Sequence, residues 1–398
     1  MTIESIHVKN FKALRDVQLD NLPQFCVFVG PNGTGKTTLF RVLAFLKNSL
    51  AKNVRAALHA EGGRNGLQDV LSRGHKGEDL AIRIAFRWEL EGREQSGVYE
   101  LHIGEDAPGA GPTVKEEWLK DSTSPQFIFK FSQGKGSFLE TETFQLPVSI
   151  EGHPKVLSLV SPESLALNLF AQLPGFPAAS SLHKLIENWH LSDFDLNRAR
   201  GDKEAGDVQR LSASGDNLPS LALHLHKNHP EIFASIKRRM KELVPGVHEI
   251  DVMETPDGRL LVRYADGAFK DPFIDRNVSD GTIKMFAYLV LLSEPKPHPI
   301  LCVEEPENLL YPKLMTGLAE EFQAYSERGG QVFVATHSPD FLDAVPLESI
   351  YWLEKVNGET TVCRAADYPL LQRLIKEGDL PGALWQQGFF DRATMKAG

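Results

Sequence analysis

The chain has 398 residues, of which 42% are hydrophobic and 24% charged, and its formal net charge is −10 at pH 7. These values are ordinary for a globular protein with a large core, and the acidic balance argues against a surface that is basic all round. The longest unbroken apolar run (285–292) is too short to span a membrane, and the N-terminus lacks a signal-peptide pattern. We therefore expect a cytoplasmic protein with no membrane association. The cysteines lie apart and show no metal-ligand spacing.

A phosphate-binding loop is the most specific pattern in the sequence. Residues 25–29 are an apolar run typical of a buried strand, residues 30–37 read G-P-N-G-T-G-K-T, and helical apolar spacing follows. In such a context the backbone N–H groups and the helix N-terminus attract phosphate. We expect Lys36 to reach the β- and γ-phosphates and the Thr37 hydroxyl to hold Mg²⁺. The residues expected to contact the nucleotide are Gly30, Asn32, Gly33, Thr34, Gly35, Lys36, Thr37 and Thr38.

The segment after this first helix has weaker signals. Residues 52–76 are rich in glycine and charge and predict a loop with a short helix near 67–71. Gln68 lies there and is a candidate contact for Mg²⁺ and an attacking water, although a surface glutamine explains it equally well. Alternating apolar residues then predict strands of an antiparallel meander, at 80–88, 97–103, 114–119 and 126–131.

Helical spacing dominates the middle of the chain, and a hairpin follows it. The predicted helices are 164–173, 180–189, 218–227 and 230–243, and a turn at 256–258 separates two short strands. The last of these helices carries a basic cluster at 237–241. A solvated helix face explains this cluster better than a nucleic-acid contact does, but both interpretations stay open.

Three polar motifs in the second half complete an ordered set. Residues 278–282 read V-S-D-G-T before an apolar helix, where Ser279 is a good N-cap and Gly281 permits close backbone approach. A buried strand at 300–303 ends in Glu304 and Glu305, and another at 332–335 is followed by His337. Two carboxylates at a strand end can divide Mg²⁺ binding and activation of water between them. Each motif alone has an ordinary structural explanation, whereas their order favours a nucleotide-hydrolysing site.

This ordered set of motifs resembles an ABC-type ATPase head of the RecF/SMC branch. Within that branch it is most similar to the stand-alone ATPases related to the ATPase part of OLD (overcoming lysogenisation defect) nucleases. Residues 10–12, 278–282 and 304–312 resemble the N-F-[RK] opening, the L-S-x-G signature and the acidic motif of that branch. The implied fold is an α/β P-loop head, a mixed central sheet flanked by helices, with an antiparallel β subdomain and a helical insertion. Its expected parts are 1–150 (N-terminal half with the β subdomain), 151–246 (helical insertion) and 247–398 (C-terminal half).

The resemblance also implies roles for individual residues. Glu304 takes the Mg²⁺-side acidic position, Glu305 is the catalytic carboxylate, and His337 senses the γ-phosphate, with Lys36 on the phosphates. Ser279 and Gly281 reach the ATP held by a second subunit. The Mg²⁺-side acid is usually aspartate, so glutamate is a departure. No long coiled coil interrupts the chain, and from the residues that follow His337 we expect no Toprim domain.

The leading functional hypothesis is a Mg²⁺-dependent ATPase whose homodimer closes on ATP and regulates an effector encoded nearby, in phage defence or DNA maintenance. Any nuclease of the system would lie on another chain. The alternative is a RecF-type DNA-binding repair ATPase, with residues 237–241 on the DNA phosphates. A transporter ATPase is the weakest reading, because the antiparallel insert and the helical block fit it poorly.

Overall fold

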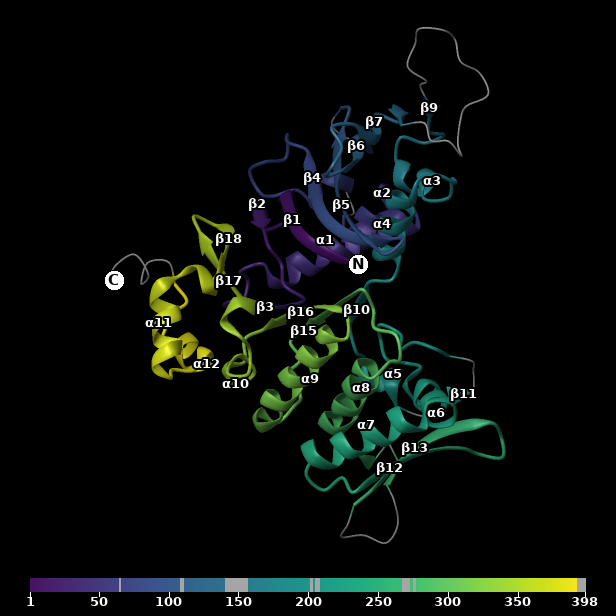
Figure 1. The fold of residues 1–398 in the computed structure, drawn as a ribbon, viewed down its shortest axis with the longest axis vertical. Helices are drawn as coiled ribbons and strands as arrows, with labels where there is room; N and C mark the ends of the chain where they lie inside the picture. Colours follow the sequence, from purple (N-terminus) through teal and green to yellow (C-terminus); the bar gives the residue numbers. More distant parts are fainter. Residues whose placement is uncertain are drawn as a thin grey trace. The chain divides into compact units, whose positions relative to one another are not determined.

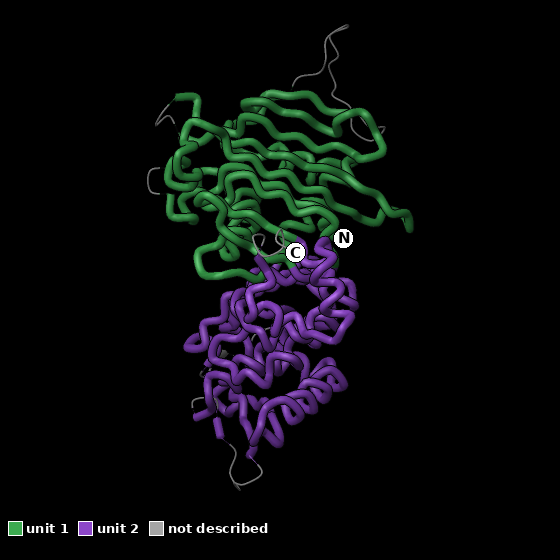
Figure 2. The backbone as a smooth tube through the Cα atoms, turned by 90° about the vertical axis from the view of Figure 1, so that its left-hand side faces the viewer, with its two compact units in different colours: residues 1–23, 29–189, 351–363 green, residues 24–28, 190–350, 364–398 purple. Residues whose placement is uncertain are grey.

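The computed structural model describes residues 1–63, 66–107, 111–139, 157–200, 203–204, 208–266, 273–274 and 277–391. The chain forms two compact units, which Figure 2 colours separately. The first comprises residues 1–23, 29–189 and 351–363, and the second comprises 24–28, 190–350 and 364–398. The boundary predicted at residue 150 falls outside the described residues, and the three-part division stays a prediction.

The first unit is built on an antiparallel sheet in the order β2-β1-β4-β5-β6-β7-β8-β9 (Figure 1). In β4, Ile82, Ile84 and Phe86 are buried whereas Arg83 is exposed, so one face packs on the core. The pairing of β4 to β7 confirms the predicted meander. The strands are β1 (Thr2–Phe11), β2 (Leu14–Leu19), β4 (Leu80–Leu90), β5 (Arg93–Glu105), β6 (Pro112–Asp121), β7 (Phe127–Ser132), β8 (Lys135–Phe138) and β9 (Leu157–Ser158).

Helices and one hairpin complete the first unit. They are α1 (Lys36–Ala51), α2 (Val54–Ala60), the 3₁₀ helix η1 (Gly66–Asp69), α3 (Ala166–Phe170), α4 (Pro177–Glu187), and strands β17 (Ile350–Val356) and β18 (Glu359–Arg364). The prediction that 52–76 is loop apart from a short helix near 67–71 is wrong at α2. The Asn53 side chain accepts a hydrogen bond from the Ala56 N–H (2.8 Å), and Val54, Ala57 and Leu58 are buried. A cap and a single buried face therefore stabilise a helix too short to show a clear period.

The second unit contains the strands that carry the acidic motif and the histidine. Their order is β10 (His190–Ser192), β15 (Ile300–Glu304), β16 (Gln331–Thr336) and β3 (Phe25–Val29). β15 and β16 are parallel, with Glu304 opposite Ala335, so their carboxyl ends lie at one edge. All of β3 and β16 is buried, which accounts for the apolar runs at 25–29 and 332–335.

A smaller sheet and further helices make up the rest of the second unit. The predicted helix 230–243 and the hairpin around 256–258 are confirmed. No helix among the described residues is long and apolar enough to cross a membrane. The elements are α5 (Leu196–Ala199), β11 (Lys203–Glu204), α6 (Leu218–Asn228), α7 (Pro230–Leu243), β12 (Glu249–Glu254), β13 (Arg259–Ala265), β14 (Phe273–Ile274), α8 (Asp280–Leu292), η3 (Pro312–Leu314), α9 (Met315–Glu327), α10 (Pro339–Leu342), η4 (Leu347–Ser349), η5 (Ala365–Asp367), α11 (Pro369–Glu377) and α12 (Pro381–Gln386).

Candidate nucleotide-binding site

The glycine-rich loop before α1 has a conformation that only glycine accommodates easily. Gly35 is the N-cap of α1 and has φ 107°, a region that L side chains rarely adopt. A Cβ there would lie 2.8 Å from Oγ1 of Thr360, and one at Gly30 would lie 2.5 Å from the carbonyl oxygen of Leu353. Thr360 Oγ1 also donates to the Thr34 carbonyl (2.8 Å). The β17–β18 hairpin thus fixes the loop from outside and leaves no room for side chains at these glycines.

The side chain of Lys36 folds back onto the glycine-rich loop that precedes it. The residue is 6% exposed, and its Nζ donates to the carbonyl oxygens of Gly30 (2.5 Å) and Pro31 (3.2 Å). The first turn of α1 contains no acidic residue, so the positive end of the helix is not neutralised there. Asn32 and Thr37 are exposed beside it. An anion reaching this loop would meet backbone N–H groups, a helix N-terminus and an ammonium group together.

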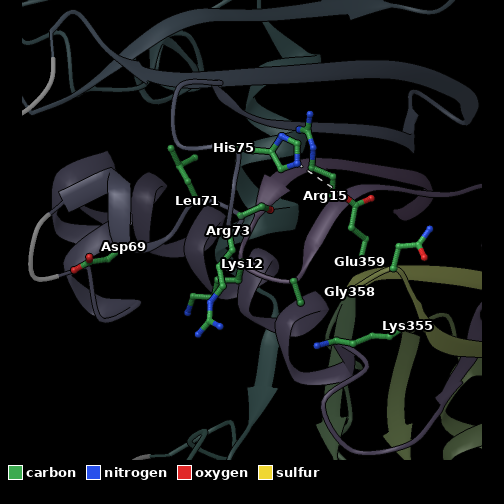
Figure 3. Close-up of a pocket in the computed structure, with 12 residues that line it drawn as sticks. Lys12, Arg15, Asp69, Leu71, Arg73, His75, Lys355, Gly358 and Glu359 are labelled. Carbon is green, nitrogen blue, oxygen red and sulfur yellow. Dashed lines mark ion pairs between the residues drawn. The ribbon is translucent and has the colours of Figure 1, made fainter.

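A basic hollow of about 710 Å³ adjoins this loop (Figure 3). The hollow and the loop share a wall, because Glu359 lines the hollow while the next residue, Thr360, contacts the loop and donates its N–H to the Ala13 carbonyl (3.3 Å). In Figure 3, Arg73 and Lys355 extend from opposite sides, and neither makes an ion pair with a described residue. The residues of the hollow are Lys12, Ala13, Arg15, Asp69, Leu71, Ser72, Arg73, His75, Lys355, Asn357, Gly358 and Glu359.

Asn10, the first residue of the N-F-K opening, holds part of the wall of this hollow in place. The side chain is fully buried, and its Nδ2 donates to the carbonyl oxygens of His75 (3.1 Å) and Glu78 (2.8 Å). Its Oδ1 accepts the N–H of Ser72 (3.1 Å). One amide therefore fixes both ends of the segment 72–78 that forms part of the wall. Sequence reasoning identified the motif but missed the hollow, because its walls come from three distant segments.

The carboxylates and the histidine lie at one edge of the sheet in the second unit. Glu305 follows β15 with φ 45°, and its N–H donates to the Ala335 carbonyl (2.7 Å). His337 Nδ1 is 3.8 Å from Oε1 of Glu305 and 3.3 Å from Oε1 of Glu307. The backbone N–H of His337 also donates to Glu307 Oε1 (2.8 Å). Glu304, the last residue of β15, is half-buried at the same edge.

Glu307 is a site residue that sequence reasoning missed. Its side chain is 13% exposed, against 38% for Glu305 and 45% for His337. A carboxylate that accepts the backbone N–H of a histidine and also lies beside its ring restricts where the ring can point. The only sequence signal was a third carboxylate directly after the Glu-Glu-Pro turn, and its contact with His337 depends on the register of two strands.

The predicted signature segment has the local structure expected of it. Ser279 caps α8, since its Oγ accepts the N–H of Thr282 (3.2 Å), which confirms the N-cap prediction. A Cβ on Gly281 would lie 2.6 Å from the carbonyl oxygen of Leu309, so the predicted close backbone approach is also confirmed. Arg200 donates to the Val278 carbonyl (3.0 Å) and pairs with Asp280, which fixes the entry to α8.

The other predicted residues are distributed between the two units. The phosphate loop and Gln68 belong to the first unit, and the signature, the carboxylates and His337 belong to the second. The Gln68 amide donates to Glu105 Oε2 (3.1 Å). Its metal role stays a prediction, as do the catalytic and ligand roles of the remaining residues.

The basic cluster at 237–241 is largely compensated by carboxylates. Lys237 pairs with Glu249 (3.0 Å), and Arg239 pairs with Glu242 (2.9 Å) and with Glu321. These ion pairs reduce the positive potential available to a nucleic-acid backbone. The arrangement agrees with a solvated helix face, the interpretation that the sequence favours.

Comparisons with known proteins identify the family. Residues 25–343 match the family described as "AAA domain, putative AbiEii toxin, Type IV TA system". Two curated proteins of Methanocaldococcus jannaschii match shorter segments. The chromosome partition protein Smc is 40% identical over 57 residues, covering 14% of this chain and 5% of Smc. The uncharacterized protein MJECL10 is 27% identical over 90 residues, covering 21% of this chain and 41% of that protein. The chain thus matches less than half the length of either relative.

The fold is shared with a solved structure. A crystal structure of an SMC head bound to the C-winged helix domain of ScpA is 15% identical, with a TM-score of 0.54, and the alignment covers 91% of this chain and 98% of that one. This likeness confirms the predicted fold class, an SMC-head-like P-loop ATPase fold with mixed α/β structure. Because the family match extends over residues 25–343, the chain belongs to the AAA-domain family described as putative AbiEii toxin of type IV toxin–antitoxin systems.

Proposed function

We propose that the chain is a Mg²⁺-dependent ATPase that acts as an ATP-driven dimerisation switch. The observation that carries this proposal is the strand–loop–helix at 25–51. Gly35 caps α1 at φ 107°, and the buried Lys36 ammonium is held by carbonyl oxygens of the loop itself. A nucleoside triphosphate can replace those carbonyls as the partner of Lys36 without any change of fold.

In the first unit, the glycine-rich loop binds one part of the nucleotide and the basic hollow binds the other. The phosphates bind the N–H groups of residues 33–38, while the base and ribose enter the adjoining hollow, where Arg73 and Lys355 supply positive charge. The hydroxyl of Thr37 and the carboxylate of Glu304 are hard oxygen donors of the kind Mg²⁺ prefers, with Gln68 as a further candidate. When bound, Mg²⁺ neutralises charge that builds up on the phosphates.

Hydrolysis uses the carboxylate edge of the second unit. Glu305 accepts a proton from the water whose oxygen attacks the γ-phosphorus, and the bond to the ADP oxygen breaks. The Asn308 amide donates to Glu305 Oε2 (2.8 Å) and so orients the carboxylate. His337, positioned by Glu307, contacts the γ-phosphate.

Dimerisation supplies the remaining contacts. Ser279 and Gly281 at the start of α8 present a hydroxyl and backbone N–H groups, which suit the γ-phosphate held by a second copy. Closure on ATP and opening after hydrolysis would then control a protein effector encoded nearby. We propose an OLD-like role in phage defence or DNA maintenance, and the family description adds toxin–antitoxin systems as a related setting. The compensated cluster at 237–241 gives the RecF-type DNA-binding alternative no specific support.

A binding and hydrolysis assay on loop variants tests the nucleotide site. Wild-type protein should bind ATP and release phosphate, and Lys36→Ala should abolish both with an unchanged circular dichroism spectrum. Gly35→Ala should also lose binding, because its Cβ would approach a threonine oxygen to 2.8 Å. Gly77→Ala is the matched control, since no atom lies within 4 Å of its Cβ position. Unchanged ATP affinity in Lys36→Ala and Gly35→Ala would remove the basis of the proposal.

A further inference from the structure

Lys284 is a buried cation in an otherwise apolar stretch of α8. The residue is 8% exposed, and its Nζ donates to the carbonyl oxygens of Asn308 (2.8 Å) and Glu305 (3.4 Å). Burial lowers the pKa of the ammonium to about 8, while the Glu307 and Glu305 carboxylates oppose that shift. An ammonium group is costly to bury unless it is paired. The partners of the Lys284 ammonium are backbone carbonyl oxygens of the loop that contains Glu305, the proposed general base.

That loop has an unusual backbone which these contacts help to hold. Glu305 (φ 45°) and Leu309 (φ 67°) both adopt the left-handed conformation, although neither is glycine. Such residues persist only where the surroundings fix them. Lys284 binds carbonyl oxygens inside the loop. The first turn of α8 also packs against the far end of the loop, because the Leu309 carbonyl oxygen lies 2.6 Å from where a Cβ on Gly281 would be. Helix and loop are therefore joined at two points.

The connection extends to the side chain of Glu305. Asn308, whose carbonyl accepts from Lys284, donates its own side-chain amide to Glu305 Oε2 (2.8 Å). At the other end, Ser279 caps the same helix that carries Lys284. A displacement of the start of α8 would thus reach the carboxylate through one lysine and one asparagine.

We propose that Lys284 is a positioning residue that links the signature helix to Glu305, so that contact of Ser279 and Gly281 with a phosphate prepares the carboxylate of the same chain for hydrolysis. This inference rests on the proposed ATPase function. It assigns to Lys284 a role in turnover and not in nucleotide binding, because its contacts are with the carboxylate loop and not with the phosphate loop.

Steady-state kinetics of full-length variants test the link. Lys284→Met keeps a long apolar stem and removes the ammonium, and it should lower kcat for ATP by roughly tenfold to a hundredfold, the range expected for a displaced catalytic group, with KM little changed. Asn308→Ala changes an exposed side chain, so folding is not at risk, and it should lower kcat in the same way. Lys376→Met on α11 removes an equal charge from an exposed position and should behave as wild type.

A double-mutant cycle separates a shared path from two independent effects. If Lys284 acts through Asn308, the double variant should lose no more kcat than the more impaired single variant. Three results would each overturn the link while leaving the ATPase proposal intact. The first is a double variant whose loss of kcat equals the product of the two single losses. The others are a wild-type kcat in folded Lys284→Met and an unaffected kcat in Asn308→Ala. A wild-type protein no more active than Lys36→Ala would instead remove the proposed function, and this inference with it.

Discussion

Glu117 makes the stability of the first unit depend on pH in a way that can be calculated. The carboxylate on β6 is fully buried. It accepts hydrogen bonds from the Tyr99 hydroxyl (3.0 Å) and from the N–H groups of Ala166 (2.5 Å) and Leu167 (2.9 Å). Burial raises the pKa of Glu117 from 4.5 to about 7, and the hydrogen bonds oppose part of that rise. A pKa raised on folding means that the folded protein holds the proton more tightly than the unfolded chain does.

The sign and size of the effect follow from this shift. The protonated carboxyl group contributes its full stabilisation below pH 4.5, and the contribution is lost as pH rises through about 7. At about 1.36 kcal/mol per pKa unit, the loss amounts to roughly 3 kcal/mol in the free energy of unfolding. Glu117→Gln cannot titrate, so the difference in unfolding free energy between wild type and variant isolates this one group.

Urea unfolding followed by tryptophan fluorescence measures that difference across the same pH range. The stability of wild type relative to Glu117→Gln should fall by roughly 3 kcal/mol between pH 4.5 and pH 8. Glu116→Gln, on the opposite face of the strand and paired with Lys130 (2.6 Å), is the matched control and should show no comparable fall. A wild-type advantage that is the same at every pH would refute the argument from burial.

Two further predictions concern the chemistry. Glu305→Gln should bind ATP but hydrolyse it more slowly by roughly two to four orders of magnitude, the loss expected of a general base, whereas Glu304→Gln should weaken Mg²⁺-dependent binding. Phosphate release and binding titrations distinguish the two, and reversed phenotypes would contradict the assigned roles. The chain alone should cut no nucleic acid with Mg²⁺ or Mn²⁺ while it hydrolyses ATP. Cleavage in a gel assay that survives the Lys36→Ala, Glu305→Gln double change would contradict this.

Local patterns predicted those elements whose signal lies within one continuous stretch. The strand at 25–29 and the helix at 230–243 agree with the structure at both ends, because an unbroken apolar run and four turns of helical spacing leave little ambiguity. The helix α2 has seven residues, so its cap at Asn53 was the only strong signal. The strand β8 was missed because Gly134 and Gly136 indicate a turn, whereas pairing with β7 resumes at Lys135.

The candidate site was predictable only as separate motifs. Ser279, Glu305 and His337 stood out by residue type and order along the chain. Glu307 did not, because its role depends on the register that aligns the ends of β15 and β16. The basic hollow depends on the side chain of Asn10 holding the segment 72–78, a contact across more than sixty residues that no local pattern contains.

The most direct test of the proposed switch is the mass of the Glu305→Gln protein, measured by light scattering with ATP, with ADP and without nucleotide, all with Mg²⁺. Each γ-phosphate shared between two copies gains charge-assisted hydrogen bonds from Ser279 and Gly281, worth roughly 1.5 to 3 kcal/mol each, and these disappear with ADP. ATP alone should therefore double the mass, and Ser279→Arg in the same background should prevent it. If the resting protein is already dimeric, a distance probe across the nucleotide sites should shorten with ATP. Neither a change of mass nor a change of distance with ATP would contradict the ATP-driven switch.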